Sequence, residues 1–375
     1  MMALPFLNPA FITPELDQAV RGGMVNTKFR YELLDNTKAS KGFLDCVQVG
    51  GSVRSSYLSE IKTTCSFSIA EVGNFSQINF LTDRVKIYCD ILNYTTNEYM
   101  SYPLGVYLMS AGTRTASEGV ISREVFGYDQ TQILKDAKHL ERFTVAVGAN
   151  IIDTVRTLLN TYGITHNIAD STEVMVAERS YDPGTEIIAT INDLFSMITY
   201  RSLYFDFNGT AVSSSYIASV NRSIETEYIT DDTSLIAPGT ELNQDLFNVP
   251  NQVLVVVSQP DRPVITATAT NDNPESPTST VSRGSTIVQV YSENEDVTTQ
   301  EQAQAKADRY LTEISQIFET IQFSTPIIPV HGENTIVSIK HTDLDISAVY
   351  SEIEWSITLQ AGTYMTHTAR RTVNV

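Results

Sequence analysis

The 375-residue chain is long enough for two or three domains with real cores, and 42% of its residues are hydrophobic, which excludes a disordered protein. Its 44 acidic and 25 basic residues give a formal net charge of −19, which argues against a protein that grips nucleic acid through its phosphates. The amino terminus lacks the basic and apolar regions of a signal peptide, and no apolar run is long enough to predict a membrane span.

The first third of the chain has the alternation of apolar and polar residues that is typical of β-strands. Residues 1–27 contain three prolines and predict an extended arm with one helical turn. Strands are expected around residues 29–33, 61–69, 85–91, 106–108 and 121–125. Short turns between such strands predict an antiparallel barrel or sandwich over residues 1–127. Cys46, Cys65 and Cys89 lie in this part without a CxxC pair, so we expect buried free thiols.

Residues 128–245 predict a small α+β domain. A short helix is expected over residues 129–139, and a longer one begins at Asn150 as N-cap and ends before Gly163. A third helix is expected to open with Asp182 as N-cap and Pro183 at its first position. Asn208-Gly209, between two alternating segments, predicts a hairpin with a type I′ turn.

Residues 246–375 predict a second β domain with one packed helix. Strands are expected around Val253–Val257 and over residues 263–270, followed by a polar loop over residues 271–285. Thr298 and Glu301 have the spacing of a capping box and open an amphipathic helix that reaches Phe318. After Phe318 the spacing of apolar residues changes to every second position, which predicts a strand that ends at Pro326 and Pro329. The apolar stripe of the helix consists of Ala303, Ala307, Tyr310, Leu311, Ile314, Ile317 and Phe318.

The last long strand is expected to place Val349, Ile353, Trp355, Ile357 and Leu359 on one face, with Trp355 buried against the helix of residues 299–318. Glu352 and Glu354 then point to the opposite face. Paired carboxylates can serve a glycosidase, but on a half-buried strand they more simply mark the face toward solvent or a partner.

The sequence predicts no catalytic, cofactor or metal site. It has no nucleophile elbow, zinc-protease motif, P-loop or dinucleotide fingerprint. No two histidines have the short spacing of a helical or loop metal site. His331 and His341 flank one predicted strand, and ordinary loop histidines are the expected interpretation of these two. Asn271, Asp272, Asn273 and Glu275 lack the spacing of an EF-hand and predict a turn-rich loop instead. The five histidines are His139, His166, His331, His341 and His367.

Three ordered stretches carry a resemblance to a known family. The first is VPNQVLVVVSQPDRPVITATATNDNPESPTSTVSRG, and the second is TTQEQAQAKADRYLTEISQIFETIQFSTPIIP. The third runs from EVFGYDQTQILKDAK through NIIDTVRTLLNTYGI to DPGTEIIATINDLFSMITYRSLYFDFNGTAV. Together they resemble the tail-hub, or baseplate-hub, proteins of tailed bacteriophages over residues 120–375. The first 120 residues match that family only in β character and position.

The resemblance implies two tube-type β domains, residues 1–127 with the arm and residues 246–375, flanking the α+β domain of residues 128–245. It implies a homotrimeric ring at the tail tip of the virion, without catalysis. The ring would join the distal tail protein or tail tube and enclose the channel for the tape-measure protein and for DNA in passage. Tail fibre or receptor-binding proteins are further expected partners. The alternative from the residues is a tail-tip protein that binds or cleaves carbohydrate, motivated by Glu352, Glu354 and the 18 tyrosines.

Overall fold

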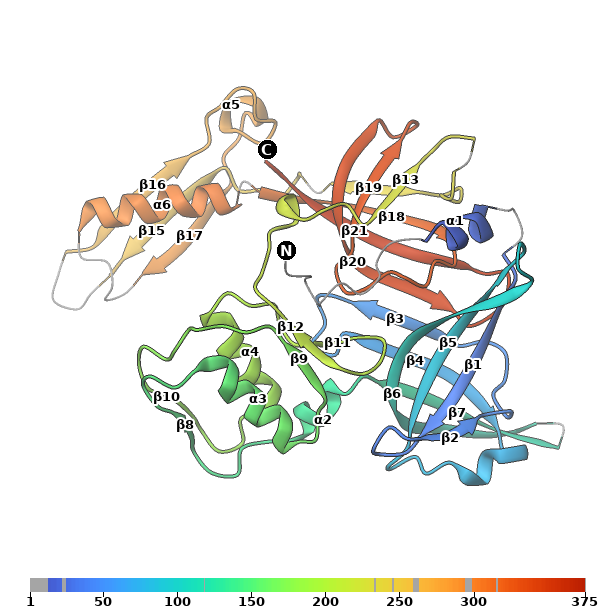
Figure 1. The fold of residues 1–375 in the computed structure, drawn as a ribbon. Coiled ribbons are helices and arrows are strands. Elements are labelled where there is room, and N and C mark those ends of the chain that lie inside the picture. Colours follow the sequence, from blue (N-terminus) through green and yellow to red (C-terminus); the bar gives the residue numbers. More distant parts are fainter. Residues whose placement is uncertain are drawn as a thin grey trace. The chain divides into compact units, whose positions relative to one another are not determined.

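A computed structural model describes residues 13–21, 25–117, 119–232, 234–244, 246–258, 263–293, 299–314 and 316–374. The chain forms two compact units, which are described separately (Figure 1). The first unit comprises Met1–Thr240 and Phe323–Ala369, and the second comprises Glu241–Gln322 and Arg370–Val375. The division of the sequence at residues 127 and 245 stays a prediction about domain organisation.

The amino-terminal part of the first unit consists mainly of long strands. Its elements are α1 (Pro14–Arg21), β1 (Thr27–Leu34), β2 (Ser40–Phe43), β3 (Ser52–Ser56), β4 (Thr63–Ala70), a 3-10 helix (Gly73–Gln77), β5 (Arg84–Asn93), β6 (Glu98–Ser117) and β7 (Val120–Tyr128). Strands β4 and β5 alternate as the sequence predicts, because one face of each lies on a core. Phe67, Ile69, Ile87 and Ile91 are fully buried there. Cys46, Cys65 and Cys89 are buried free thiols, as expected.

A helical segment with short strands follows in the same unit, and we call residues 129–215 the middle segment. Its elements are α2 (Thr131–Asp136), β8 (Phe143–Val145), α3 (Ile151–Thr161), β9 (His166–Ile168), β10 (Arg179–Tyr181), α4 (Ile187–Met197), β11 (Tyr204–Phe205) and β12 (Ala211–Ser213). The Asn150 side chain accepts a hydrogen bond from Asp153 N, and Gly163 has φ +67°, which confirms both predicted ends of α3. Isoleucine, leucine and phenylalanine side chains of α3 and α4 fill its core.

Two local predictions in the middle segment are wrong. Helix α4 begins after Glu186 and not after Asp182, because Gly184 has φ +90° and turns the chain before the helix starts. The hairpin of β11 and β12 is present, but its turn is not type I′, since Asn208 does not have a positive φ. Asp206 N donates to Thr210 O and Gly209 N to Asp206 O, a type I turn followed by a left-handed glycine.

The rest of the first unit completes its large sheet. The remaining elements are a 3-10 helix (Ser219–Asn221), β13 (Thr226–Ile229), the end of β18 (Gln316–Pro326), β19 (Ile336–His341), β20 (Ile346–Thr358) and the start of β21 (Tyr364–Asn374). The strand order is β18-β21-β20-β3-β4-β7-β6-β5-β1-β2, with β19 also on β20 and β13 parallel to β19. Strand β20 therefore pairs with β3 from the start of the chain, as Figure 1 shows. The strand order ends at β2, so these described strands form an open sheet and not a closed barrel.

In the second unit a helix covers a small sheet. Its elements are β14 (Glu241–Gln244), β15 (Gln252–Val257), β16 (Ile265–Thr270), α5 (Thr280–Arg283), β17 (Val288–Glu293), α6 (Gln300–Ile314) and most of β18. In the sheet of β16, β15 and β17, the central strand β15 runs antiparallel to β16 and parallel to β17. Strand β14 pairs antiparallel with β18. Ala303 and Ala307 of α6 are buried against the valines of β15 and the alanines of β16.

The organising helix of this unit differs from its prediction at both ends. Thr298 lies outside the described residues, and the capping box is formed by Thr299 and Gln302. Thr299 Oγ1 accepts from Gln302 N at 3.2 Å, and Gln302 Oε1 accepts from Thr299 N at 3.3 Å. The helix ends at Ile314, so Phe318 belongs to strand β18 and is exposed. The polar loop of residues 271–285 contains the short helix α5, which the sequence did not predict.

Trp355 is buried as predicted, at 2% exposure, but its predicted partner is wrong. Its ring lies 6.5 Å from that of Phe207, and its Nε1 donates to Gly332 O at 3.1 Å. Helix α6 packs on β15 and β16 instead, because its alanine stripe fits their small side chains. The mainly β fold with an α+β insert is confirmed. None of the described helices has the length and apolar character that crossing a bilayer requires.

Candidate functional site

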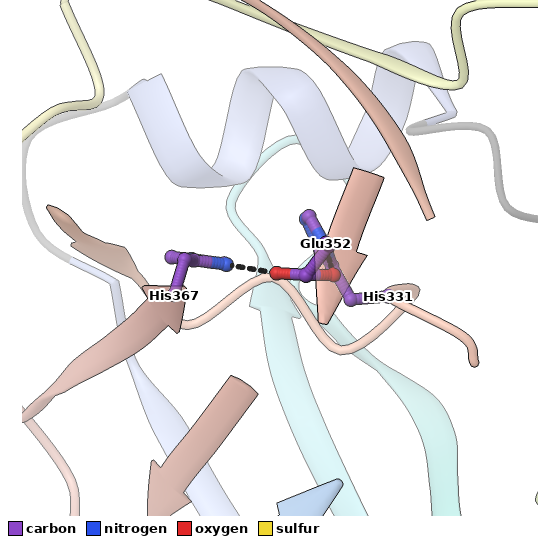
Figure 2. A group of neighbouring side chains, drawn as sticks. All are labelled: His331, Glu352 and His367. Carbon is purple, nitrogen blue, oxygen red and sulfur yellow. Dashed lines mark hydrogen bonds and ion pairs between the residues drawn. The ribbon is translucent and has the colours of Figure 1, made fainter. Parts of the chain in front are cut away.

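Three side chains that are distant in sequence meet inside the first unit. His331 lies in the loop between β18 and β19, Glu352 on β20 and His367 on β21 (Figure 2). Strands β21 and β20 are neighbours and β19 pairs with β20, so the sheet brings these segments together. The side chains are exposed by 1%, 2% and 0%, respectively. We call these three residues the His-Glu-His cluster.

The Glu352 carboxylate is held between the two imidazoles. His331 Nδ1 lies 2.7 Å from Glu352 Oε2, and His367 Nδ1 lies 2.6 Å from Glu352 Oε1. Burial opposes ionisation of Glu352, but its attraction to His331 and the hydrogen bonds from both rings lower the pKa of Glu352 to about 2. Glu352 is therefore a carboxylate at neutral pH. Burial lowers the pKa of His367 from its ordinary value, although Glu352 opposes this shift.

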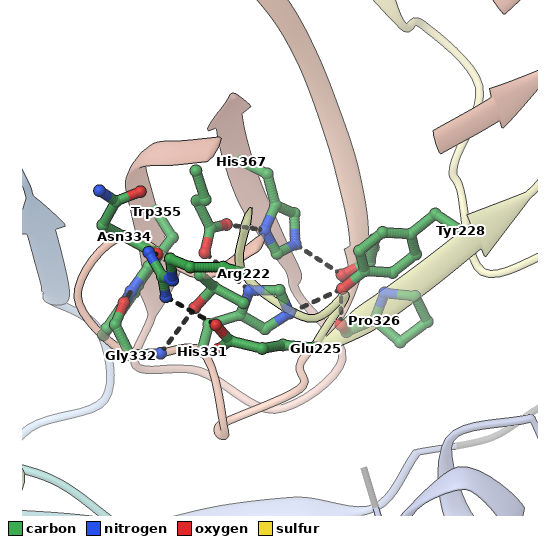
Figure 3. Close-up of polar contacts among 12 residues, drawn as sticks. Arg222, Glu225, Tyr228, Pro326, His331, Gly332, Asn334, Trp355 and His367 are labelled. Carbon is green, nitrogen blue, oxygen red and sulfur yellow. Dashed lines mark hydrogen bonds and ion pairs between the residues drawn. The ribbon is translucent and has the colours of Figure 1, made fainter. Parts of the chain in front are cut away.

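The Nε2 atom of each imidazole, which faces away from Glu352, lies beside a hydroxyl group (Figure 3). His331 Nε2 lies 2.7 Å from Tyr228 OH on β13, and His367 Nε2 lies 2.8 Å from Thr325 Oγ1 on β18. Thr325 Oγ1 also donates to Pro326 O at 2.8 Å. Every polar atom of the three cluster side chains thus has a protein partner, as buried polar groups require.

Aromatic rings and a braced loop fix the orientation of the cluster. The rings of Phe323 and His367 stack at 4.7 Å with an interplanar angle of 13°, and Tyr228 stacks on His331 at 6.1 Å. The loop that carries His331 is braced by the bond from Trp355 to Gly332 O and by Arg222, which donates to Asn334 O at 2.8 Å (Figure 3). Both imidazoles are therefore held in one orientation.

The structure corrects the expectation for Glu352. It places His331 in a loop, as expected, but buries its side chain. Glu352 is buried and does not face solvent. The buried residues of β20 are Tyr350 and Glu352 in its first half and Trp355 and Ile357 in its second, so burial is not confined to the predicted face of the strand. Val349 is exposed instead. Glu354 is partly exposed and binds Arg54, so it is not paired with Glu352. No sequence pattern indicates this site, since its members come together only through strand pairing.

The other candidate residues lie apart from the cluster. His139 contacts Thr190, His166 contacts Asn160, and His341 ends β19. In the loop of residues 271–285, Asn273 Oδ1 accepts from Glu275 N and Asn271 Nδ2 donates to Ser276 Oγ, which confirms the turn-rich loop. Among the described residues, the His-Glu-His cluster is the one group whose donor atoms, two imidazole nitrogens and a carboxylate oxygen within 4.8 Å, suit a metal ion.

No family model and no curated protein match the chain. Several solved structures do, at low sequence identity. A tail protein from Neisseria meningitidis MC58 aligns with a TM-score of 0.61 and 11% identity over 92% of this chain and 97% of its own. The prophage MuSo2 43 kDa tail protein from Shewanella oneidensis aligns with a TM-score of 0.57 and 12% identity over 91% of this chain and 98% of its own.

Two further alignments agree in fold. The prophage tail protein gp18 from Listeria monocytogenes EGD-e aligns with a TM-score of 0.52 and 11% identity over 91% and 94% of the two chains. A chain of the Francisella PdpA-VgrG complex aligns with a TM-score of 0.57 and 7% identity over 94% of this chain and 54% of its own. The predicted resemblance is thereby confirmed at the level of fold: this chain has the fold of phage tail proteins.

Proposed function

We propose that the chain is a structural protein of a phage tail, the hub of its tip or baseplate. The observation that carries this proposal is the shared fold over 92% of this chain and 97% of the Neisseria tail protein. The alignment runs over nearly the full length of both chains and not over one domain, and the proposed role follows from this likeness of fold by analogy. The expected location is the tail tip of a virion, without a catalytic role.

The proposed assembly is a homotrimeric ring. Strand β2 lies at the end of the strand order with all four residues exposed, and Phe43 on it is 47% exposed. Exposed sheet edges pair readily with another chain, and a closed ring satisfies such edges. The ring would dock on the distal tail protein or tube and enclose the path of the tape-measure protein and DNA. Tail fibre or receptor-binding proteins would attach around it.

The glycosidase form of the carbohydrate alternative loses the pair of carboxylates that motivated it. Glu352 is buried and held by two histidines, and Glu354 binds Arg54. A glycosidase needs two carboxyl groups that both reach one glycosidic bond. We therefore keep the structural role as the only proposal.

The test is the oligomeric state, measured by light scattering coupled to size exclusion at micromolar concentration. The wild-type chain should elute at three times 41.6 kDa. Phe43→Lys places a charge on the exposed β2 edge and should shift the population toward monomer. Leu140→Lys is the control, because Leu140 is 92% exposed in the middle segment. A monomeric wild type that binds cell-wall polysaccharide would reject the hub and restore the alternative.

A further inference from the structure

We propose that the His-Glu-His cluster binds a divalent transition metal ion of the zinc class through two imidazole nitrogens and one carboxylate oxygen. The ligand atoms are His331 Nδ1, Glu352 Oε and His367 Nδ1. The ion would have a structural role, since it would join the His331 loop to β20 and β21 in the interior of the first unit.

The donor set fits this class of metal. Two histidines and one carboxylate are a recurrent ligand set for Zn²⁺, and imidazole also suits cobalt and nickel, whereas Ca²⁺ and Mg²⁺ prefer oxygen atoms alone. The three ligand atoms lie within 4.8 Å of one another. Bonds of about 2.0–2.2 Å place ligand atoms roughly 3.3 Å apart, so binding an ion would lengthen the distances of 2.7 and 2.6 Å between Glu352 and the two rings.

The hydrogen atoms of the network support an added cation. With both rings neutral and Nδ1–H donating to Glu352, His367 Nε2 must accept the Thr325 hydroxyl hydrogen. Thr325 also lies 2.8 Å from Pro326 O, and one hydrogen cannot serve both acceptors. When a metal takes both Nδ1 atoms, each ring carries its hydrogen on Nε2. His331 then donates to Tyr228 OH and His367 to Thr325 Oγ1, which leaves the Thr325 hydrogen for Pro326 O.

The surroundings supply what metal ligands need around them. A histidine ligand is normally oriented by a partner at its other ring nitrogen, and Tyr228 and Thr325 occupy these positions. A buried carboxylate is costly without a compensating cation, and a divalent ion provides one. A proton on His367 Nε2 would complete the same hydrogen bonds, so the experiment must separate a metal from a proton.

The full-length chain is unfolded in denaturant with a chelator, refolded with or without ZnCl₂, and freed of loosely bound metal. We expect one zinc per chain by elemental analysis and a higher melting temperature for the zinc-refolded sample. Refolding with CoCl₂ should give the intense visible bands of tetrahedral cobalt. No bound zinc and equal melting temperatures would overturn the proposal.

Variants outside the ligand set keep the test independent of gross misfolding. Tyr228→Phe and Thr325→Val each remove a hydroxyl partner and should weaken zinc affinity by about 10- to 100-fold in a chelator competition. His367→Gln should abolish the cobalt bands. His166→Gln is the matched control and should bind zinc like the wild type, because His166 lies in the middle segment beside Asn160. Unchanged affinity in both hydroxyl variants would also count against the site.

Discussion

The middle segment and the second unit both pack helices on small sheets, but with different side chains. In the middle segment, α3 and α4 contribute large residues such as Ile152, Leu159 and Phe195, all fully buried. In the second unit, α6 contributes Ala303 and Ala307 against valines and alanines. Small side chains allow close approach of helix and sheet but remove less apolar area from water. Regions with less buried apolar area open at lower free energy, so the second unit should unfold locally first.

The largest expected effect is the loss of a core aromatic from the middle segment. Phe195 is fully buried and stacks on Tyr200 at 5.9 Å. Phe195→Ala should lower the free energy of unfolding by about 3–5 kcal/mol, measured by urea denaturation at an unchanged slope. If Phe195→Ala cost less unfolding free energy than Val255→Ala in the second unit, the larger core would not be the more stabilising one.

The hairpin turn tests how firmly the middle segment is anchored. Gly209 has φ +74°, and its carbonyl oxygen accepts from Lys38 Nζ at 2.7 Å and Gln130 Nε2 at 2.6 Å. A Cβ atom there would lie 3.0 Å from Val106 Cβ. Gly209→Val should therefore cost about 2–3 kcal/mol from backbone strain and crowding. Gly163→Val, at φ +67° with open space around it, is the control and should cost less.

A smaller effect is expected in the core of the second unit. Val255 is fully buried beneath α6. Val255→Ala removes two methyl groups and should cost about 1–2 kcal/mol. Hydrogen exchange should show the loss of protection confined to β15, β16 and α6. Loss of protection spread equally through the middle segment would mean that both regions open together.

The helix caps should give the smallest and most equal effects. The Asn150 side chain caps α3 through Asp153 N, and Thr299 caps α6 through Gln302 N. Asn150→Ala and Thr299→Ala should each cost about 1 kcal/mol, since each frees one backbone donor. Thermal melting of the two variants measures these losses of stability. A substantially larger loss for Thr299→Ala would show that the second unit depends on its cap because its core is small.

Periodicity predicted the local elements well. The alternation of β4 and β5, the limits of α3 and the change from helix to strand before Ile321 all follow from neighbouring residues. The turn at Gly184 was missed, and so was the burial of Glu352, because tertiary packing decides which face of a strand is buried. Periodicity could not predict the His-Glu-His cluster, since His331, Glu352 and His367 meet only through the pairing of strands that are distant in sequence.

The pairing of β20 with β3 has a consequence for how the chain is made. Arg54 on β3 and Glu354 on β20 are partners although they lie 300 positions apart. At roughly 5–20 residues per second, a ribosome needs about 15–60 s to add the second after the first. During that time β3 exposes an unpaired edge, and unpaired edges promote aggregation. The nascent protein therefore passes through a prolonged stage in which chaperones have access to an incomplete sheet.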